Sequence, residues 1–171
     1  YSTYGFSLLG AMVEEATNTP FENYVQAKIA NVAGMTSFTY MLNGQDGFEF
    51  DCTGAMQTDH EEDTDYKVPG GGFYSNIVDL ARFTEGLINN DFITLTGALW
   101  IDVPGNAPYN YRKGIFLKRD RNDDIYVYHG GDNQSVETYM GFFPGSKDGV
   151  CFMTNADSYI SKDDLAERIF N

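Results

Sequence analysis

The feature that most restricts the fold of this chain is a change of hydrophobic period between its two halves. In residues 2–16 the apolar side chains recur at spacings of three and four, which is the pattern of one helix face. After Pro108 the chain instead consists of short β-rich runs separated by turn residues. Helices followed by a meander of strands predict an α+β fold with an antiparallel sheet.

Two helices are predicted before residue 36. The first runs over residues 2–16, and Asn18 suits its C-terminal end. The second begins where Thr19 would cap it, Pro20 would take the first helical position and Glu22 would close a capping box. The two apolar faces comprise Phe6, Leu9, Met12, Val13 and Ala16, and then Phe21, Tyr24, Val25, Ile29 and Val32.

Residues 41–67 are predicted to form a long acidic loop, with short strands near residues 48–52. Loops of this length usually serve a site or are mobile. The stretch PGGGFYSN is predicted to be a tight turn, after which Ser75 or Asn76 caps a helix. That helix carries Ile77, Leu80, Ala81, Phe83 and Leu87 on one side, and Asp79, Arg82 and Glu85 on a charged outer face. A further short helix is expected over residues 95–101.

Four strands and a closing helix are predicted after residue 107. The strands lie in YRKGIFLKRD, DIYVYHGG, ETYMGFFPG and GVCFMTNAD, with hairpin turns at RNDD and GSKDG. Ser161 would cap the last helix, which is expected to bury Leu165, Ala166, Ile169 and Phe170. We therefore divide the chain into a mostly helical region, residues 1–107, and a region of strands and a closing helix, residues 108–171.

Composition and charge exclude several classes of protein. A chain of 171 residues with 42% hydrophobic and 15% aromatic residues is too apolar to be disordered and long enough to bury a core. A net charge of −14 argues against binding nucleic acid or anionic membranes, because phosphate repels such a surface. No apolar run approaches the ~20 residues of a membrane-spanning helix.

Metal and disulfide chemistry have little support in the residue spacing. Cys52 and Cys151 have neither metal-binding spacing nor the density of a disulfide scaffold, and they leave the redox compartment open. The acidic run TDHEEDTD could attract Ca²⁺, but its spacing fits no calcium loop, so a solvated loop is the simpler interpretation. His60-Glu61 resembles the start of a zinc-protease helix, but Thr64 stands where the second histidine must be.

Three stretches carry the chemistry: YSTYGFSLLGAMVEEATNTPFENYVQAKIANVAGM, PGGGFYSNIVDLARF and HGGDNQSVETYMGFFPGSKDGVCFMTN. In order and together they resemble the serine β-lactamase and penicillin-binding-protein family, on its class C, D-alanyl-D-alanine carboxypeptidase and esterase branch. The first is similar to the Tyr-x-Asn motif and the helices that follow it. The second resembles a Gly-Gly turn and a helix with an Asp-Leu-Ala core. The third is similar to the strand in which this branch has His-x-Gly for Lys-Thr-Gly.

The resemblance implies roles for the residues at matching positions. Tyr1 matches the catalytic tyrosine, whose phenolate would carry the proton of a nucleophilic serine, with its pKa lowered by a lysine ammonium. His129 would hold a substrate carboxylate or polarise the tyrosine network. Asp132 would supply a backbone N–H to the oxyanion hole, and Gly130 and Gly131 would let substrate lie along the strand edge. Outside this context, Tyr1 is an ordinary terminal aromatic and His129 an ordinary strand-end histidine.

The chain departs from the family pattern at two points. Thr3 stands where the family has asparagine; its hydroxyl cannot bridge a lysine and a substrate amide, which counts against β-lactam recognition more than against ester or peptide hydrolysis. The nucleophile motif Ser-x-x-Lys is absent, because no serine has a lysine three residues later. Thr64 has that spacing to Lys67 but lies on the wrong side of Tyr1. Without a nucleophile no acyl-enzyme forms, so the chain alone is expected to be inactive.

These resemblances imply that residues 1–171 are the C-terminal portion of a β-lactamase-like domain. The chain would start at the catalytic tyrosine and lack the N-terminal strands and the nucleophile helix. That half would come from the same full-length protein, a second polypeptide or a swapped copy. The substrate would be a peptide, amide, ester or β-lactam carbonyl, and no metal or organic cofactor is implied. The alternative is a non-catalytic binding or structural module. The family implies a periplasmic or extracellular location, with a cytoplasmic one left open by esterase relatives.

Overall fold

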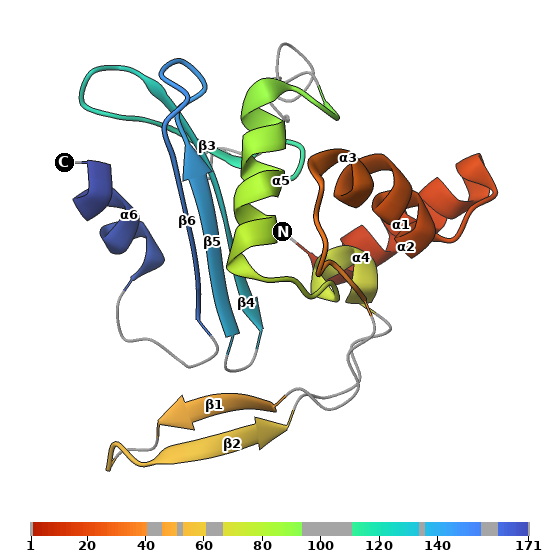
Figure 1. Ribbon diagram of the computed structural model, residues 1–171, viewed down its shortest axis with the longest axis horizontal. Coiled ribbons are helices and arrows are strands. Elements are labelled where there is room, and N and C mark those ends of the chain that lie inside the picture. The colour runs from red at the N-terminus through yellow and green to blue at the C-terminus, as the bar shows by residue number, and fades with distance from the viewer. Residues whose placement is uncertain are drawn as a thin grey trace.

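A four-stranded antiparallel sheet with helices on both faces forms the centre of the fold (Figure 1). This computed structural model describes residues 2–40, 46–50, 53–60, 67–93, 111–133, 136–154 and 161–170. The strands neighbour one another in chain order: β3 (Phe116–Arg119), β4 (Ile125–Asn133), β5 (Val136–Phe142) and β6 (Gly149–Thr154). The predicted antiparallel meander and the α+β class are confirmed.

The sheet contributes to two apolar clusters, one on each face. Successive residues of a strand point to opposite faces, so each strand supplies side chains to both clusters. Helix α5 (Ile77–Asn89) covers one face and α6 (Lys162–Phe170) the other (Figure 1). The α5 cluster contains Leu87, Ile115, Val127, Met140 and Phe142, and the α6 cluster contains Tyr126, Tyr139 and Ala166.

The N-terminal helices lie beyond α5, on the side away from the sheet (Figure 1). Helix α1 (Thr3–Thr17) ends at Asn18, which adopts the left-handed conformation with φ 48°, as expected of a helix terminus. Helix α2 (Phe21–Val25) continues through a π-helical segment, η1 (Gln26–Ala30), into α3 (Asn31–Ala33). The stretch predicted as a tight turn, residues 69–76, begins within a short helix, α4 (Val68–Gly71).

The start of α2 differs from the prediction. Thr19 does not cap the helix; its hydroxyl donates to the carbonyl of Thr17 at 3.1 Å. Pro20 occupies the N-cap position, so the helix begins one residue later than expected. The Phe21 N–H donates instead to the Glu14 carboxylate at 2.8 Å, because a charged acceptor on the preceding helix outcompetes a local hydroxyl.

The packed side of α1 is centred on Gly10 rather than on the whole predicted stripe. A Cβ at Gly10 would collide with the ring of Pro69, so only glycine allows α4 to approach this closely. Leu9 and Met12 are 52% and 60% exposed, in contrast to the predicted face. Two other predicted core residues, Val32 and Ile169, are also exposed, whereas Ala166 is buried as expected.

A separate two-stranded hairpin lies within the predicted acidic loop. β1 (Asp46–Phe50) pairs antiparallel with β2 (Met56–His60), with Phe48 opposite Thr58. The region is therefore more regular than predicted. The helix expected over residues 95–101 lies outside the described residues. Within the described ranges, none of the helices reaches the length and apolarity that a bilayer span requires.

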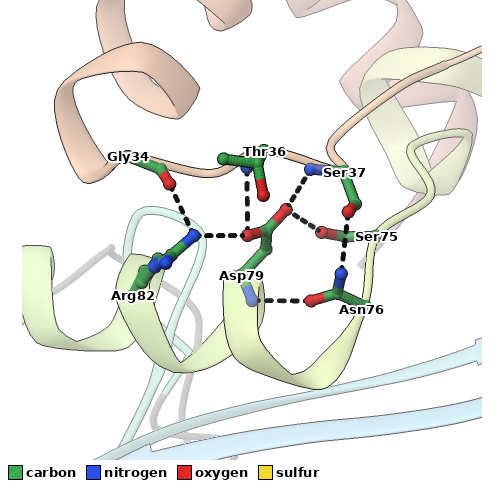
Figure 2. Close-up of polar contacts among 7 residues, drawn as sticks. All are labelled: Gly34, Thr36, Ser37, Ser75, Asn76, Asp79 and Arg82. Carbon is green, nitrogen blue, oxygen red and sulfur yellow. Dashed lines mark hydrogen bonds and ion pairs between the residues drawn. The ribbon is translucent and has the colours of Figure 1, made fainter.

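Asp79, in the first turn of α5, is fully buried, which corrects the prediction that it shares a charged outer face with Arg82 and Glu85. Its carboxylate accepts hydrogen bonds from the backbone N–H groups of Thr36 at 3.1 Å and Ser37 at 2.6 Å (Figure 2). The Arg82 guanidinium lies 3.3 Å away, while Glu85 is exposed. Two backbone donors and a cation compensate the burial of this charge.

The same cluster ties the segment after α3 to the start of α5. The Asn76 side chain accepts from the Asp79 N–H at 2.9 Å and so caps α5, as predicted. Arg82 also donates to the Gly34 carbonyl at 2.8 Å, and Asn76 donates to the Ser37 hydroxyl at 2.8 Å (Figure 2). These contacts fix how the N-terminal helices sit against α5.

Replacing Asp79 by asparagine is expected to destabilise the fold by about 2–4 kcal/mol, because the amide removes the charge and turns an NH₂ group toward a backbone donor. Equilibrium urea unfolding measures this loss. The matched control is Glu85→Gln, which removes an exposed carboxylate from the same helix and should change stability by less than about 0.5 kcal/mol. Equal midpoints for the two variants would contradict the assignment.

The same substitution has a predicted pH signature. Burial alone would raise the Asp79 pKa, but the backbone hydrogen bonds from Ser37 and Thr36, and the Arg82 charge, hold the pKa below its ordinary value of 3.8. The stabilisation is therefore complete above the unfolded pKa and is lost as pH falls through the folded pKa. The stability difference between wild type and Asp79→Asn should be constant above about pH 5 and shrink below pH 3.8.

Candidate active site

His129 lies on β4, on the face of the sheet that α5 covers. It pairs with Met140 of β5, which belongs to the α5 cluster. Its ring packs against Tyr111 and Phe116, with centroid separations of 5.9 and 5.6 Å. The Tyr111 hydroxyl oxygen is 3.4 Å from Nε2 of His129. A phenol and an imidazole thus lie within hydrogen-bonding distance of each other.

The surroundings of His129 favour its neutral form. Burial lowers the pKa of the imidazole below 6.5, and a hydrogen bond with the Gly130 backbone only partly opposes this. A neutral imidazole accepts one hydrogen bond and donates another, but it carries no charge to hold a carboxylate. Of the two roles implied by the resemblance, polarising a tyrosine network fits this environment better.

The two glycines after His129 make room on opposite faces of β4. A Cβ at Gly131 would collide with the hydroxyl oxygen of Thr138, its partner on β5. A Cβ at Gly130 would meet only ordinary van der Waals neighbours, including the Lys162 side chain at 3.8 Å. Gly131 is therefore required by the close approach of Thr138, whereas Gly130 leaves space beside Lys162.

The edge of β4 that pairs with β3 loses this partner beyond Tyr128. The ladder between β3 and β4 pairs Phe116 with Tyr128 and goes no further. The other edge of β4 stays paired with β5 as far as Asn133. Within the described part of the chain, β3 therefore does not pair with the residues from Gly130 to Asp132, so this side of β4 is a candidate position for an extended ligand.

The structure brings together only some of the predicted site residues. His129, Gly130, Gly131 and Asp132 are consecutive on β4. Thr3 lies in the first turn of α1, where its methyl group and carbonyl press against Gly70 of α4. Tyr1 lies outside the described residues, so its convergence with His129 stays a prediction.

Two residues beside the site were missed by sequence reasoning. Tyr111 is eighteen positions from His129, and no spacing rule links them. Lys162 begins α6 and donates from Nζ to the Gly131 carbonyl at 2.9 Å. The only sequence signal for Lys162 was its place just after the predicted cap Ser161, and that signal indicates a helix start rather than a site.

The described cysteine, Cys151, does not offer a second reactive centre. Burial raises the pKa of the Cys151 thiol, although a contact with the Thr84 hydroxyl at 3.1 Å opposes this, so the thiol stays neutral and is a poor nucleophile. Cys52 lies outside the described residues. Among the residues that the structure does describe, no group of three metal-ligating side chains comes together.

Sequence and structure comparisons give the family. A sequence model of the family named Beta-lactamase matches residues 1–169. No curated protein matches the chain. Among solved structures, the octameric penicillin-binding-protein homologue from Pyrococcus abyssi superposes with a TM-score of 0.82 and 22% identity, covering 99% of this chain and 41% of that one.

Two further structures extend this likeness. The penicillin-binding protein from Bacillus halodurans has a TM-score of 0.74 and 22% identity over 100% of this chain and 55% of its own. The D-amino acid amidase from Ochrobactrum anthropi SV3, solved with D-phenylalanine, has a TM-score of 0.72 and 17% identity over 99% of this chain and 59% of its own. At these identities the likeness shows the fold, and the chain spans 41–59% of the three structures.

The glycine pair provides a matched test of the site. Gly131→Ala should destabilise the protein by about 1–3 kcal/mol, because the new methyl group overpacks against Thr138. Gly130→Ala, its neighbour on the same strand, should cost clearly less. Thermal unfolding of both variants measures the difference. Adding Thr138→Ala to Gly131→Ala should recover part of the loss, and a double variant no better than Gly131→Ala would contradict the packing.

Proposed function

The chain belongs to the beta-lactamase family, and on that premise we propose that it is the C-terminal portion of a serine hydrolase that works through an acyl-enzyme. The observation that carries this proposal is the half-buried, neutral His129 beside the Tyr111 hydroxyl, on a strand that the described part of β3 pairs only as far as Tyr128. An ordinary strand-end histidine would not need a phenol partner.

In the proposed reaction, a serine hydroxyl from outside this chain attacks the substrate carbonyl. Tyr1 takes the serine proton and passes it to the leaving group. The negative charge that develops on the carbonyl oxygen is met by the Asp132 backbone N–H. The leaving group departs, the serine ester remains, and water hydrolyses it. His129 donates to or accepts from the phenol network without adding charge, and Thr3 offers a single hydroxyl near the start of α1.

The proposed partner is the half of the domain that contains the nucleophile. Two surfaces support it. On α1, the apolar side chains of Tyr4, Leu8 and Met12 are 83%, 61% and 60% exposed. At the sheet, β6 pairs only with β5 among the described strands, so its outer edge is open to another strand. The partner would come from the same polypeptide, a second chain or a swapped copy.

The proposed substrate is a peptide, amide, ester or β-lactam carbonyl. The sequence of residues 41–67 is acidic, and the net charge of the chain is −14. Such a charge disfavours anionic substrates and tolerates cationic ones. Export to the periplasm or the cell exterior fits substrates of the cell-wall type, while a cytoplasmic esterase remains the alternative.

The second candidate function is a non-catalytic binding or structural module. It is favoured by Thr3, which stands in the asparagine position and packs against Gly70. The sequence upstream of Tyr1 separates the two candidates. A Ser-x-x-Lys on a helix there supports the hydrolase, and its absence supports the module.

Labelling with a fluorescent fluorophosphonate tests the proposal directly. The full-length protein is expected to become labelled at a serine outside residues 1–171, whereas the 171-residue chain alone should not label, because it lacks the nucleophile. A fluorescent penicillin should label more weakly than the fluorophosphonate, given Thr3. Folded full-length protein that resists both reagents would exclude the hydrolase and leave the module.

The pH dependence of labelling tests the state of His129. Because its folded pKa lies below 6.5, the neutral ring persists as pH drops through 6.5, and the rate should fall only at lower pH. His129→Gln keeps a neutral hydrogen-bonding side chain and should lose this step while retaining a reduced rate. A fall centred at or above pH 6.5 that disappears in His129→Gln would show that the ring is protonated more easily than its burial implies.

A further inference from the structure

The side chain of Lys162, the first residue of α6, contacts the stretch of β4 that forms the candidate site. Its side chain is only 20% exposed, and its Nζ donates to the Gly131 carbonyl oxygen at 2.9 Å. The same ammonium lies 3.3 Å from Oδ2 of Asp132. The space above Gly130 accommodates its aliphatic chain, with Cδ 3.8 Å from where a Cβ would stand. Helix α6, which covers the face of the sheet opposite α5, thus places a cation against the backbone of the candidate site.

The carbonyl that Lys162 contacts belongs to a particular peptide unit. The Gly131 C=O and the Asp132 N–H are the two polar groups of one amide, and in a trans peptide they point in opposite directions. A charge-assisted hydrogen bond on the oxygen draws electron density from the nitrogen, so the N–H becomes a stronger donor. The Asp132 N–H is the group that the proposed function assigns to the oxyanion.

We propose that Lys162 is a positioning residue that polarises the Gly131–Asp132 peptide and so strengthens the oxyanion donor. The inference rests on the proposed function for its catalytic consequence, and on the described contacts for its geometry. In the transition state, the Asp132 N–H faces the charge on the substrate oxygen. At the other end of the same amide, the Gly131 carbonyl accepts from the Lys162 ammonium. The ammonium is fixed beforehand by α6, so it needs no reorganisation during the reaction.

The contact with the Asp132 carboxylate does not explain the arrangement by itself. That carboxylate is 70% exposed, and exposed ion pairs contribute at most about 1 kcal/mol. An ammonium that served only this pair could remain in solvent, whereas Lys162 is mostly buried and lies closer to the carbonyl than to the carboxylate. The part-buried hydrogen bond to the Gly131 carbonyl is therefore the dominant contact.

The test uses Lys162→Met, which keeps the aliphatic chain and removes the donor, and Lys162→Arg, which keeps a charged donor. Arg168→Met, at an exposed position on the same helix, is the matched control for lost charge. In the full-length protein, steady-state hydrolysis of a chromogenic ester is measured for each variant, with thermal unfolding as a check on folding. The amide proton shift of Asp132 is read from ¹⁵N–¹H spectra.

We expect Lys162→Met to lower kcat about tenfold with KM changed less than about twofold, because the lost interaction strengthens only in the transition state. Lys162→Arg should keep most of the rate, and Arg168→Met should match wild type. The Asp132 amide proton should move upfield in Lys162→Met alone, as its donor strength falls. A folded Lys162→Met protein with wild-type kcat, or with an unmoved Asp132 amide proton, would overturn the inference.

Failure of the inference and failure of the proposed function are distinguishable. If wild-type protein hydrolyses the ester but Lys162→Met is unaffected, the hydrolase stands and the role of Lys162 falls. If wild-type protein hydrolyses nothing, the hydrolase falls, and the Asp132 shift alone decides whether Lys162 polarises the peptide. A loss of rate that tracks a loss of thermal stability equally in Lys162→Met and Lys162→Arg indicates a merely structural tether and also overturns the inference.

Discussion

The buried carboxylate of Asp79 is the interaction on which the arrangement of the fold depends. It accepts two backbone N–H groups from the segment after α3 and stands in the first turn of α5. α5 in turn packs on the sheet through Leu87, next to Val127 of β4. Without this anchor, the backbone N–H groups of Thr36 and Ser37 would lose their acceptor and the N-terminal helices would lose their register against α5. Any residue from those helices that reaches the site depends on that register.

Strand β4 connects the two faces of the sheet to the chemistry. The alternation of a strand sends His129 toward the α5 face and leaves Gly130 beside Lys162 on the α6 face. One short stretch of β4 therefore presents the neutral imidazole of His129 on the α5 face and is contacted by the Lys162 ammonium from α6. The two groups have different roles. The neutral imidazole can donate or accept a hydrogen bond, whereas the ammonium donates to the Gly131 carbonyl. The proposed reaction uses both at the same peptide edge.

Where prediction from sequence succeeded, the determinant was local. Asn18 and Asn76 ended and began helices as expected, because a left-handed terminus and a side-chain cap involve only neighbouring residues. Prediction failed where a distant group changed the outcome. Asp79 looked like a surface residue because the backbone N–H groups that donate to its carboxylate lie more than forty positions away in the sequence. Thr19 lost its capping role to Glu14, and Leu9 and Met12 lie on a side of α1 that no described element covers.

The sequence by itself determined the family resemblance, the order of helices and strands, and the succession of His129, Gly130, Gly131 and Asp132 on one strand. These follow from period, turn chemistry and contiguous motifs, which are properties of neighbouring residues. Only the tertiary structure decided that Tyr111 meets His129, that Thr138 requires Gly131 and that Lys162 reaches the Gly131 carbonyl. Those contacts arise from strand register and helix placement, and no local pattern encodes the distance between two side chains that packing brings together.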